Sequence, residues 1–312
     1  MTHLSGAELG KNSAPSSRHV STEIDDQPSA WARAAKLGLT ERVRQALPER
    51  GQRAAIIGCG TSFFIAQSYA ELREGSGHGE TDAFPASEFP TRRSYDTVVA
   101  LTRSGTTTEV LRLLARLRAG TGPRTVAITA DLDTPVVELA DHQVVLDFAD
   151  EKSIVQTRFA TTSLALWRAW LGEDLAVVVK QGQSAVTEPL PPRTLDSTQF
   201  TFLGSGMSIG IANEAALKLR EASQSWTESY PAMEFRHGPI SVVGRASTVW
   251  IFGPPPLGLL EDLEVTGAHV ESSGLDPMAD LIRAQRLAVA LAEAKGLDPD
   301  KPRNLTRSVL LS

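Results

Sequence analysis

Short, continuously apolar segments alternate along this chain with longer segments of helical periodicity. The first pattern occurs at residues 53–58, 96–101, 125–130 and 143–148, and the second at residues 64–75, 108–120 and 161–171. Strands that are apolar without alternation are typical of a parallel sheet that is covered on both faces. The order of the segments therefore predicts an α/β fold, in which helices flank a parallel sheet.

The same alternation begins again after residues 184–197, a segment with three prolines that we interpret as a linker. Strands are expected at residues 199–204 and 247–253, and helices at residues 212–223 and 278–296. Both halves place the pattern G-x-G-x-S between a strand and a helix, at residues 58–62 and 204–208. We therefore expect two tandem copies of one flavodoxin-like, three-layer α/β/α unit, at residues 23–183 and 198–312.

Residues 1–22 are rich in Ser, Gly, His and Asn and show no periodicity, so we expect a disordered leader there. A helical pattern follows from Glu23 to Leu37 and is broken by Pro28. The sequence contains neither a secretory signal nor an apolar run of the roughly 20 residues that span a bilayer. We therefore expect a cytoplasmic protein without a membrane partner.

The composition argues against several kinds of partner and site. The 312 residues include 31 Lys and Arg against 37 Asp and Glu, which gives a net charge of −6. Nucleic-acid-binding proteins usually present a basic face, so we expect no nucleic-acid partner. Cys59 is the only cysteine, which excludes an intramolecular disulfide and any metal site built from several cysteines. We expect no metal and no organic cofactor.

The turn after the first predicted strand has the composition of an anion site. Its glycines let the backbone approach a ligand, and the free N–H groups at the start of the next helix point toward it. A dinucleotide site would need a third glycine, but Phe63 and Ile209 stand at that position in the two halves. A nicotinamide cofactor is therefore not expected.

A second turn, at residues 102–108, follows the strand at residues 96–101 and begins a helix. It contains five hydroxyl side chains and Gly105. Such a turn can bind a phosphate monoester through hydrogen bonds and the helix dipole, without net charge. The alternative is an ordinary Ser/Thr capping turn. One hydroxyl would suffice for a cap, so the run of hydroxyls favours the anion.

Two further groups of residues suit proton transfer. One face of a predicted helix carries Glu214, Lys218 and Glu221. Taken alone, these three residues are more simply interpreted as a solvent-exposed face with an ion pair. His237 precedes Gly238 and Pro239 in an irregular segment, where a histidine suits proton transfer near neutral pH. A single histidine is more often structural, so neither group identifies a function by itself.

Together, and in this order, these segments resemble the double sugar isomerase (SIS) domain family. The likeness is greatest to the isomerase half of glucosamine-6-phosphate synthase and to its deaminase and deglycase relatives. The segments that carry it are GCGTS at 58–62, RSGTT at 103–107, ALKLRE at 216–221, EFRHGP at 234–239 and KPRNLTRS at 301–308. We recognise no counterpart of the glutaminase half with its leading catalytic cysteine, so glutamine-dependent synthesis is not expected.

The resemblance implies that the two turns hold the phosphate and hydroxyls of a sugar phosphate. The substrate-binding residues expected on this basis are Cys59, Gly60, Ser62, Thr102, Arg103, Ser104, Gly105, Thr107, Ile154 and Gln156. Arg103 stands where the synthase has Gln, and its guanidinium would add a charged contact to the phosphate. Gln156 replaces a smaller Ser, which would change the contact to the upper carbons of the sugar.

The resemblance also implies the catalytic residues. Glu221 corresponds to the general base that moves a proton between C1 and C2, and Lys218 to a lysine one turn before it. His237 corresponds to a ring-opening histidine that comes from the neighbouring subunit, so a homodimer is expected. Arg307 stands where the family has a lysine that forms a Schiff base. A guanidinium cannot form one, but it could stabilise a developing enolate oxygen.

We therefore expect an enzyme of the isomerase/deaminase type. Its substrate would be a hexosamine 6-phosphate, either glucosamine 6-phosphate or its N-acetylated form, and the reaction would begin with proton abstraction at C2. An alternative is a lyase or dehydratase that eliminates at C3 of an N-acetylated substrate, which the loss of the lysine at position 307 favours. A non-catalytic sugar-phosphate sensor is the alternative of another class.

Overall fold

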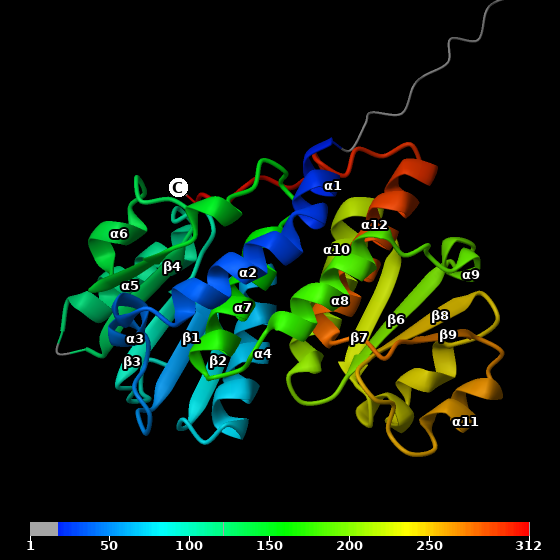
Figure 1. Cartoon of the computed structure of the whole chain (residues 1–312), viewed down its shortest axis with the longest axis horizontal. Coiled ribbons are helices and arrows are strands. Elements are labelled where there is room, and N and C mark those ends of the chain that lie inside the picture. Colours follow the sequence, from blue (N-terminus) through cyan, green and yellow to red (C-terminus); the bar gives the residue numbers. More distant parts are fainter. Residues whose placement is uncertain (1–17, 121, 312) are drawn as a thin grey trace, which may run out of the picture.

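The computed structural model describes residues 18–120 and 122–311, in which a layer of helices separates two parallel β-sheets (Figure 1). The first sheet has the order β2-β1-β3-β4-β5, with strands Thr81–Pro85, Ala54–Gly58, Thr97–Leu101, Arg124–Thr129 and His142–Val145. The second has the order β7-β6-β8-β9, with strands Trp226–Pro231, Gln199–Gly204, Ser247–Phe252 and His269–Ser272. All pairings are parallel, so the predicted α/β class is confirmed.

The helices flank both sheets. The α-helices are α1 (Arg18–Asp25), α2 (Gln27–Gly38), α3 (Glu41–Ala46), α4 (Thr61–Gly75), α5 (Thr108–Arg118), α6 (Val136–Leu139), α7 (Arg158–Trp170), α8 (Ala176–Thr187), α9 (Pro192–Leu195), α10 (Ser208–Ser223), α11 (Leu259–Glu264) and α12 (Pro277–Ala294). Short 3-10 turns are η1 (Ala86–Glu88), η2 (Asp147–Ala149), η3 (Glu234–His237) and η4 (Pro239–Val242). Of the helices in the described ranges, none combines the length and apolar character that a membrane crossing requires.

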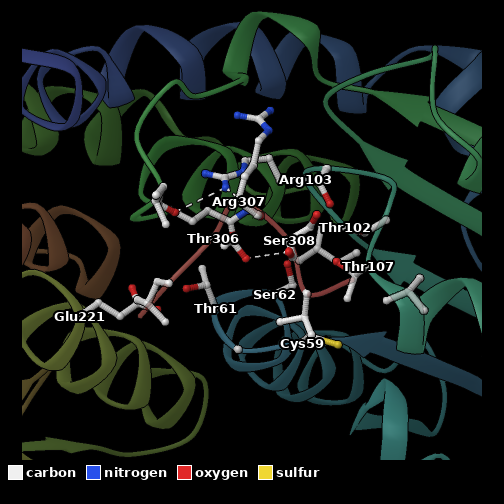
Figure 2. Close-up of a pocket in the computed structure, with 18 residues that line it drawn as sticks. Cys59, Thr61, Ser62, Thr102, Arg103, Thr107, Glu221, Thr306, Arg307 and Ser308 are labelled. Carbon is white, nitrogen blue, oxygen red and sulfur yellow. Dashed lines mark hydrogen bonds between the residues drawn. The ribbon is translucent and has the colours of Figure 1, made fainter. Parts of the chain in front are cut away.

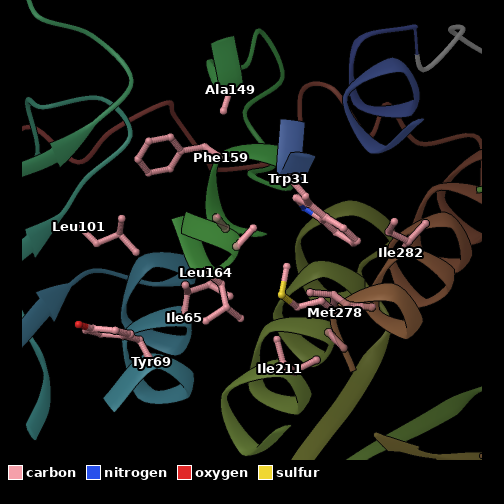
Figure 3. Close-up of a cluster of buried hydrophobic side chains, with 14 of the residues drawn as sticks. Trp31, Ile65, Tyr69, Leu101, Ala149, Phe159, Leu164, Ile211, Met278 and Ile282 are labelled. Atoms are coloured by element: carbon pink, nitrogen blue, oxygen red, sulfur yellow. The ribbon is translucent and has the colours of Figure 1, made fainter. Parts of the chain in front are cut away.

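The inner faces of the two sheets share one apolar core (Figure 3). Ile56 and Val99 of the first sheet and Phe202 and Trp250 of the second belong to the same buried cluster. Helices α4, α7, α10 and α12 fill the space between the sheets, and Tyr69 stacks on Trp167 with 4.2 Å between ring centroids. Because the core is continuous, the positions of α4 and α10 relative to each other are set by packing.

The outer faces have separate, smaller cores. Alternate residues of each strand point there, as the period of two in a strand requires. In the first half Ile57 and Ala100 belong to a buried cluster with Leu113 of α5. In the second half Ile251 shares such a cluster with Leu263 of α11. Each central strand is thus apolar on both faces, which explains its continuous apolar run.

Two sequence predictions about the connecting segments need correction. Residues 18–22 are part of α1, with Val20 buried, so the disordered leader predicted for residues 1–22 is wrong over that stretch. Residues 1–17 lie outside the described residues. The predicted linker at 184–197 is also partly helical, since it contains the end of α8 and all of α9. The long amphipathic face of α8 packs on α2 and α12, which explains this helix.

Candidate active site

A pocket of about 200 Å³ lies at the carboxyl ends of β1 and β3, beneath the C-terminal tail (Figure 2). The register of the sheet aligns the ends of these two strands, with Ile57 opposite Ala100. The pocket brings together most of the residues predicted from the sequence: Cys59, Gly60, Ser62, Thr102, Arg103, Ser104, Thr107, Ile154, Gln156, Glu221 and Arg307. In the view of Figure 2, Glu221 and Thr107 lie on opposite sides of the pocket.

The β1–α4 turn forms one wall because strand and helix approach closely. A Cβ on Gly58 would lie 2.7 Å from Ser62, and Gly60 has a φ of 53°. Only glycine accommodates both conditions without strain. The N-terminus of α4 therefore faces the pocket with Thr61 and Ser62 buried in its first turn. No side chain caps this helix end, and although the Ser62 N–H donates to the Cys59 carbonyl at 3.1 Å, the positive end of the helix dipole favours an anion there.

The 102–108 turn forms the second wall. Thr107 is the N-cap residue of α5, but its side chain makes no capping hydrogen bond. The Thr107 hydroxyl therefore does not cap the helix; the residue lines the pocket instead. Gly105, with a φ of 63°, does not line the pocket; a Cβ there would lie 2.1 Å from the Thr134 hydroxyl, so this glycine permits the turn rather than contacting a ligand.

On the side opposite Thr107, α10 contributes a carboxylate held by a buried ammonium group. Glu221 Oε2 lies 2.5 Å from Lys218 Nζ, which also donates to Thr61 Oγ1 at 2.9 Å. Lys218 is buried behind Glu221 and does not line the pocket. Burial alone would lower the pKa of Lys218, but the carboxylates of Glu214 and Glu221 outweigh burial and raise it. The ammonium thus stays charged and stabilises the Glu221 carboxylate.

Glu214 is a fully buried carboxyl group on the same helix face. Its Oε1 lies 3.6 Å from Lys218 Nζ, and neither oxygen has a hydrogen-bond partner among the described residues. Burial raises the pKa of Glu214 to about 8. The group therefore holds its proton more tightly than an ordinary carboxyl, and Glu221 is the carboxylate in closer contact with Lys218, at 2.5 Å against 3.6 Å for Glu214.

The two arginines at the pocket direct their guanidinium groups elsewhere than predicted. Arg103 Nη1 lies 3.5 Å from Glu151 Oε2, and its Nη groups donate to backbone carbonyls, so they do not face a bound phosphate. Arg307 lines the pocket, but its guanidinium bonds the Asp150 carboxylate and the Glu151 carbonyl. Because neither Asp150 nor Glu151 lines the pocket, this geometry does not support an enolate contact by Arg307.

His237 does not reach the pocket of its own chain. It lies in η3, it is exposed, and it is absent from the pocket lining, as is Lys218. Within one chain the structure therefore does not bring His237 and Glu221 together. Its origin in a neighbouring subunit remains a prediction.

Several lining residues were not singled out from the sequence. They are Thr61, Leu101, Val110, Leu305, Thr306, Ser308 and Val309. Most lie in the tail, where the sequence analysis predicts only Arg307 as a site residue. The hydroxyl side chains of Thr306 and Ser308 are the feature of the sequence that could have indicated these further contacts.

The pocket contains a thiol, but it is unreactive near neutral pH. Burial raises the pKa of Cys59 to about 11, so this group is protonated and a weak nucleophile. Among residues 18–120 and 122–311, no three His, Cys, Asp or Glu side chains are grouped so as to hold a metal ion. The chemistry that these residues offer is therefore acid–base chemistry beside an anion site.

The chain is similar to known proteins in sequence and in fold. Residues 49–169 match the SIS domain family. Over 92% of its length the chain is 25% identical to a glutamine–fructose-6-phosphate aminotransferase (isomerizing) from Sulfurisphaera tokodaii, of which it covers 55%. The chain thus spans about half the length of the curated relatives it matches.

Solved structures share the fold over nearly the whole chain. Glucosamine-6-phosphate deaminase from Thermotoga maritima matches with a TM-score of 0.78 and 23% identity, covering 94% of this chain and 99% of that one. Tagatose-6-phosphate ketose/aldose isomerase from Escherichia coli matches with a TM-score of 0.77 and 20% identity, over 94% and 99%. Residues 49–169 thus match the SIS domain family, and the likeness to the aminotransferase and to the solved structures extends over nearly the whole chain.

Proposed function

We propose that this chain is an enzyme that acts on a hexosamine 6-phosphate by abstracting a proton at C2, in an isomerase or deaminase reaction. One observation carries the proposal: a single pocket holds two helix N-termini rich in hydroxyls and, on another side, a carboxylate backed by a buried ammonium. The names of the similar proteins, which refer to fructose, glucosamine and tagatose phosphates, support a sugar phosphate as the ligand.

In this proposal the phosphate binds at the hydroxyl side of the pocket. Ser62, Ser104 and Thr107 offer hydroxyl donors, and the first turns of α4 and α5 offer N–H groups. Such a site holds an anion through oriented dipoles, without a cation. The sugar would then extend toward Glu221, with C1 and C2 at the end away from the phosphate.

The chemical step follows from the position of Glu221. Its carboxylate takes the proton from C2 of the open-chain aldose, the electron pair of the C–H bond forms a C1–C2 double bond, and the C1 carbonyl pair moves to its oxygen, which gives an enediolate. Return of the proton to C1, with transfer of the C2 hydroxyl proton to the C1 oxygen, gives the ketose. When C2 carries an amino group, an N–H proton moves to the C1 oxygen instead, and the product is a C2 imine that water hydrolyses to the ketose with release of ammonia. Lys218 keeps Glu221 in place during this transfer.

We further propose that residues 198–312 form a second SIS domain and that two chains assemble as a homodimer. The shared strand order of the two sheets supports the repeat. The exposure of His237, away from the pocket of its own chain, supports its use in the site of a partner chain. There it would act on the ring oxygen when the cyclic sugar opens.

A second candidate is elimination at C3 of an N-acetylated hexosamine 6-phosphate. The observation that favours it is Arg307, which cannot form a Schiff base and whose guanidinium is paired with Asp150. An enolate formed at C2 without an imine can expel the C3 oxygen instead of gaining a proton at C1. A sugar-phosphate sensor would bind the same ligands without either reaction.

Proton NMR in D₂O tests the proposal. Purified protein is mixed with glucosamine 6-phosphate, N-acetylglucosamine 6-phosphate or fructose 6-phosphate, and the C2 proton of the two aldoses and the C1 protons of fructose 6-phosphate are followed. Deuterium at C2, or loss of the C2 proton as product forms, supports proton abstraction, and the product distinguishes isomerisation, deamination and elimination.

The matched variant is Glu221→Gln, which retains the shape of the side chain but not the base. We expect its exchange and turnover to fall by about 10²–10⁴-fold. If the wild-type protein leaves all three sugars unchanged while they still raise its melting temperature, the enzyme proposal is wrong and the sensor is correct.

A further inference from the structure

We propose that Arg103 is a positioning residue that fastens the C-terminal tail, residues 300–311, across the pocket. This inference rests on the proposed function in one respect only, since it takes the pocket to be the place where a sugar phosphate reacts. The sequence predicted a phosphate contact for this guanidinium. Its hydrogen bonds point to the tail instead.

All four N–H donors of the two Nη groups of Arg103 have partners within the protein. Nη1 lies 3.5 Å from Glu151 Oε2 and donates to the Ser153 carbonyl at 3.2 Å. Nη2 donates to the carbonyls of Ile154 at 3.4 Å and of Arg307 at 3.3 Å. A guanidinium has five N–H donors, so only Nε remains, and it is buried without a hydrogen bond to any described residue. The Nη groups therefore bond two segments, residues 151–154 and the tail, and so join both to the loop that carries Arg103.

The Glu151 carboxylate, which pairs with Arg103, is itself held in place by further hydrogen bonds. Glu151 is fully buried, and its second oxygen, Oε1, accepts from the backbone N–H groups of Thr157 at 2.6 Å and Arg158 at 2.7 Å. These N–H groups belong to the start of α7, so the Glu151 carboxylate cannot move without disturbing that helix. Arg103 thus connects the tail to a rigid part of the first half through buried, charge-assisted contacts.

The tail has further contacts at both ends and at Arg307, whose guanidinium bonds the Asp150 carboxylate and the Glu151 carbonyl. At its beginning, Asp300 accepts from the backbone N–H of Val20 in α1 at 2.7 Å. Near its end, Ser308 accepts from the Thr106 hydroxyl at 3.0 Å, and the Val309 carbonyl accepts from Thr108 N at 3.1 Å. Arg103 supplies the buried contact in the middle, where the tail borders the pocket.

The tail depends on these polar contacts because it buries little apolar surface. Leu305, Val309, Leu310 and Leu311 are all exposed. A segment with few buried apolar contacts opens locally at low cost. Loss of the Arg103 fork would therefore release the tail preferentially, and with it the part of the pocket wall formed by residues 305–309.

Hydrogen exchange measured by mass spectrometry on the full chain tests this inference. In Arg103→Gln we expect the backbone amides of residues 300–311 to exchange about tenfold faster than in the wild type, because the hydrogen bond from a charged donor to the Arg307 carbonyl is lost. The matched control is Arg283→Gln. Arg283 is likewise buried and paired with carboxylates, Asp280 at 2.8 Å and Glu271 at 3.0 Å, but it lies in the second half, and its hydrogen bonds and ion pairs with the described residues do not reach the tail. This control should leave tail exchange unchanged.

A second measurement separates the two roles of Arg103. The affinity of each protein for inorganic phosphate is determined by titration. A positioning role predicts faster tail exchange with phosphate affinity lowered less than about threefold. If Arg103→Gln leaves tail exchange unchanged but strongly lowers the affinity for phosphate, Arg103 binds phosphate directly and the inference is overturned. If Arg103→Gln does not fold, Arg103→Lys, which retains a charge beside Glu151 but lacks the fork, carries the same test.

The exchange experiment needs no turnover, so it separates this inference from the proposed function. If the wild-type protein converts none of the sugar phosphates, the proposed function is refuted, but the hydrogen-exchange result for the tail still stands. Where activity is present, we expect Arg103→Gln to lower kcat more than it raises KM, because the tail wall is disordered for part of the time and the phosphate donors are retained.

Discussion

At the scale of single residues, the direction of a side chain decides its role at this pocket. Arg103 and Arg307 were both assigned from their place in a motif, and both border the pocket. Their guanidinium groups nevertheless bind Glu151 and Asp150, which are 48 and 157 residues away in the sequence. A motif can locate an arginine beside a site, but its partner is set by tertiary contacts that no local pattern contains.

The buried carboxyl of Glu214 predicts a specific pH dependence of stability. Its pKa is raised from the ordinary value of 4.5 to about 8 by burial. Between those pH values the folded protein retains a proton that the unfolded chain has released, so this group contributes less stability as pH rises through the window. In Glu214→Gln that decline is absent. We therefore expect the melting temperature of the variant, relative to the wild type, to increase from pH 5 to pH 8.

Thermal unfolding of both proteins at a series of pH values measures this difference. Well below pH 4.5 Glu214 is neutral in both the folded and the unfolded chain, so the comparison there isolates the effect of exchanging OH for NH₂. A difference that stays constant from pH 5 to pH 8 would contradict the raised pKa. It would mean that Lys218 holds Glu214 ionised throughout this range.

At the scale of elements, the sequence predicted the central strands better than the edges. The apolar runs at β1, β3, β4, β6 and β8 predicted these strands to within two residues at either end, because strands buried on both faces are apolar throughout. The edge strands β2, β7 and β9 were not predicted. Most of their residues are partly exposed, so their sequences are mixed. Among the edges β5 is the exception, since Val144 and the adjacent Leu146 are buried.

The crossing of α4 and α10 determines the distance between the two sides of the pocket. A Cβ on Gly210 of α10 would lie 2.3 Å from the Phe64 carbonyl and 2.3 Å from Ser68 Oγ of α4. Gly210→Ala must therefore push the helices apart. We expect it to lower the free energy of unfolding by about 1–3 kcal/mol, the usual cost of overpacking, and to reduce turnover because Glu221 moves relative to Ser62. Chemical denaturation and the NMR assay measure the two effects.

Gly75→Ala is the matched control for this substitution. Gly75 ends α4, and nothing lies within 4 Å of a Cβ placed there. An added methyl group at such a site usually stabilises a protein by about 0.4–1 kcal/mol, because the unfolded chain loses freedom. Equal effects of the two substitutions would show that the close approach of the helices is unimportant.

At the scale of the whole molecule, the pocket depends on contact between the two halves. Lys218 of the second half donates to Thr61 of the first, and Asn213 donates to Gln67 at 2.9 Å. The repeat of G-x-G-x-S predicted two similar units, but it contained no information on which helices meet. That arrangement follows from the shared core, in which α4 and α10 lie side by side (Figure 1).

The proposed homodimer predicts complementation between two inactive chains. Glu221→Gln lacks the base, and His237→Ala lacks the exposed histidine. In a heterodimer of the two, one site would combine the intact Glu221 of one chain with the intact His237 of the other, and the second site would have neither. We therefore expect each purified homodimeric variant to be nearly inactive and the heterodimer to recover about half of the wild-type activity.

Co-expression with two affinity tags gives the heterodimer, and a wild-type pair carrying the same tags is the control. If His237 served the pocket of its own chain, each chain in the heterodimer would retain its own defect and no activity would return. That outcome would require η3 to move toward the pocket of its own chain, since the structure leaves His237 exposed and outside it. Recovery of activity would instead mean that one chain supplies the phosphate site and the base while the other supplies the histidine.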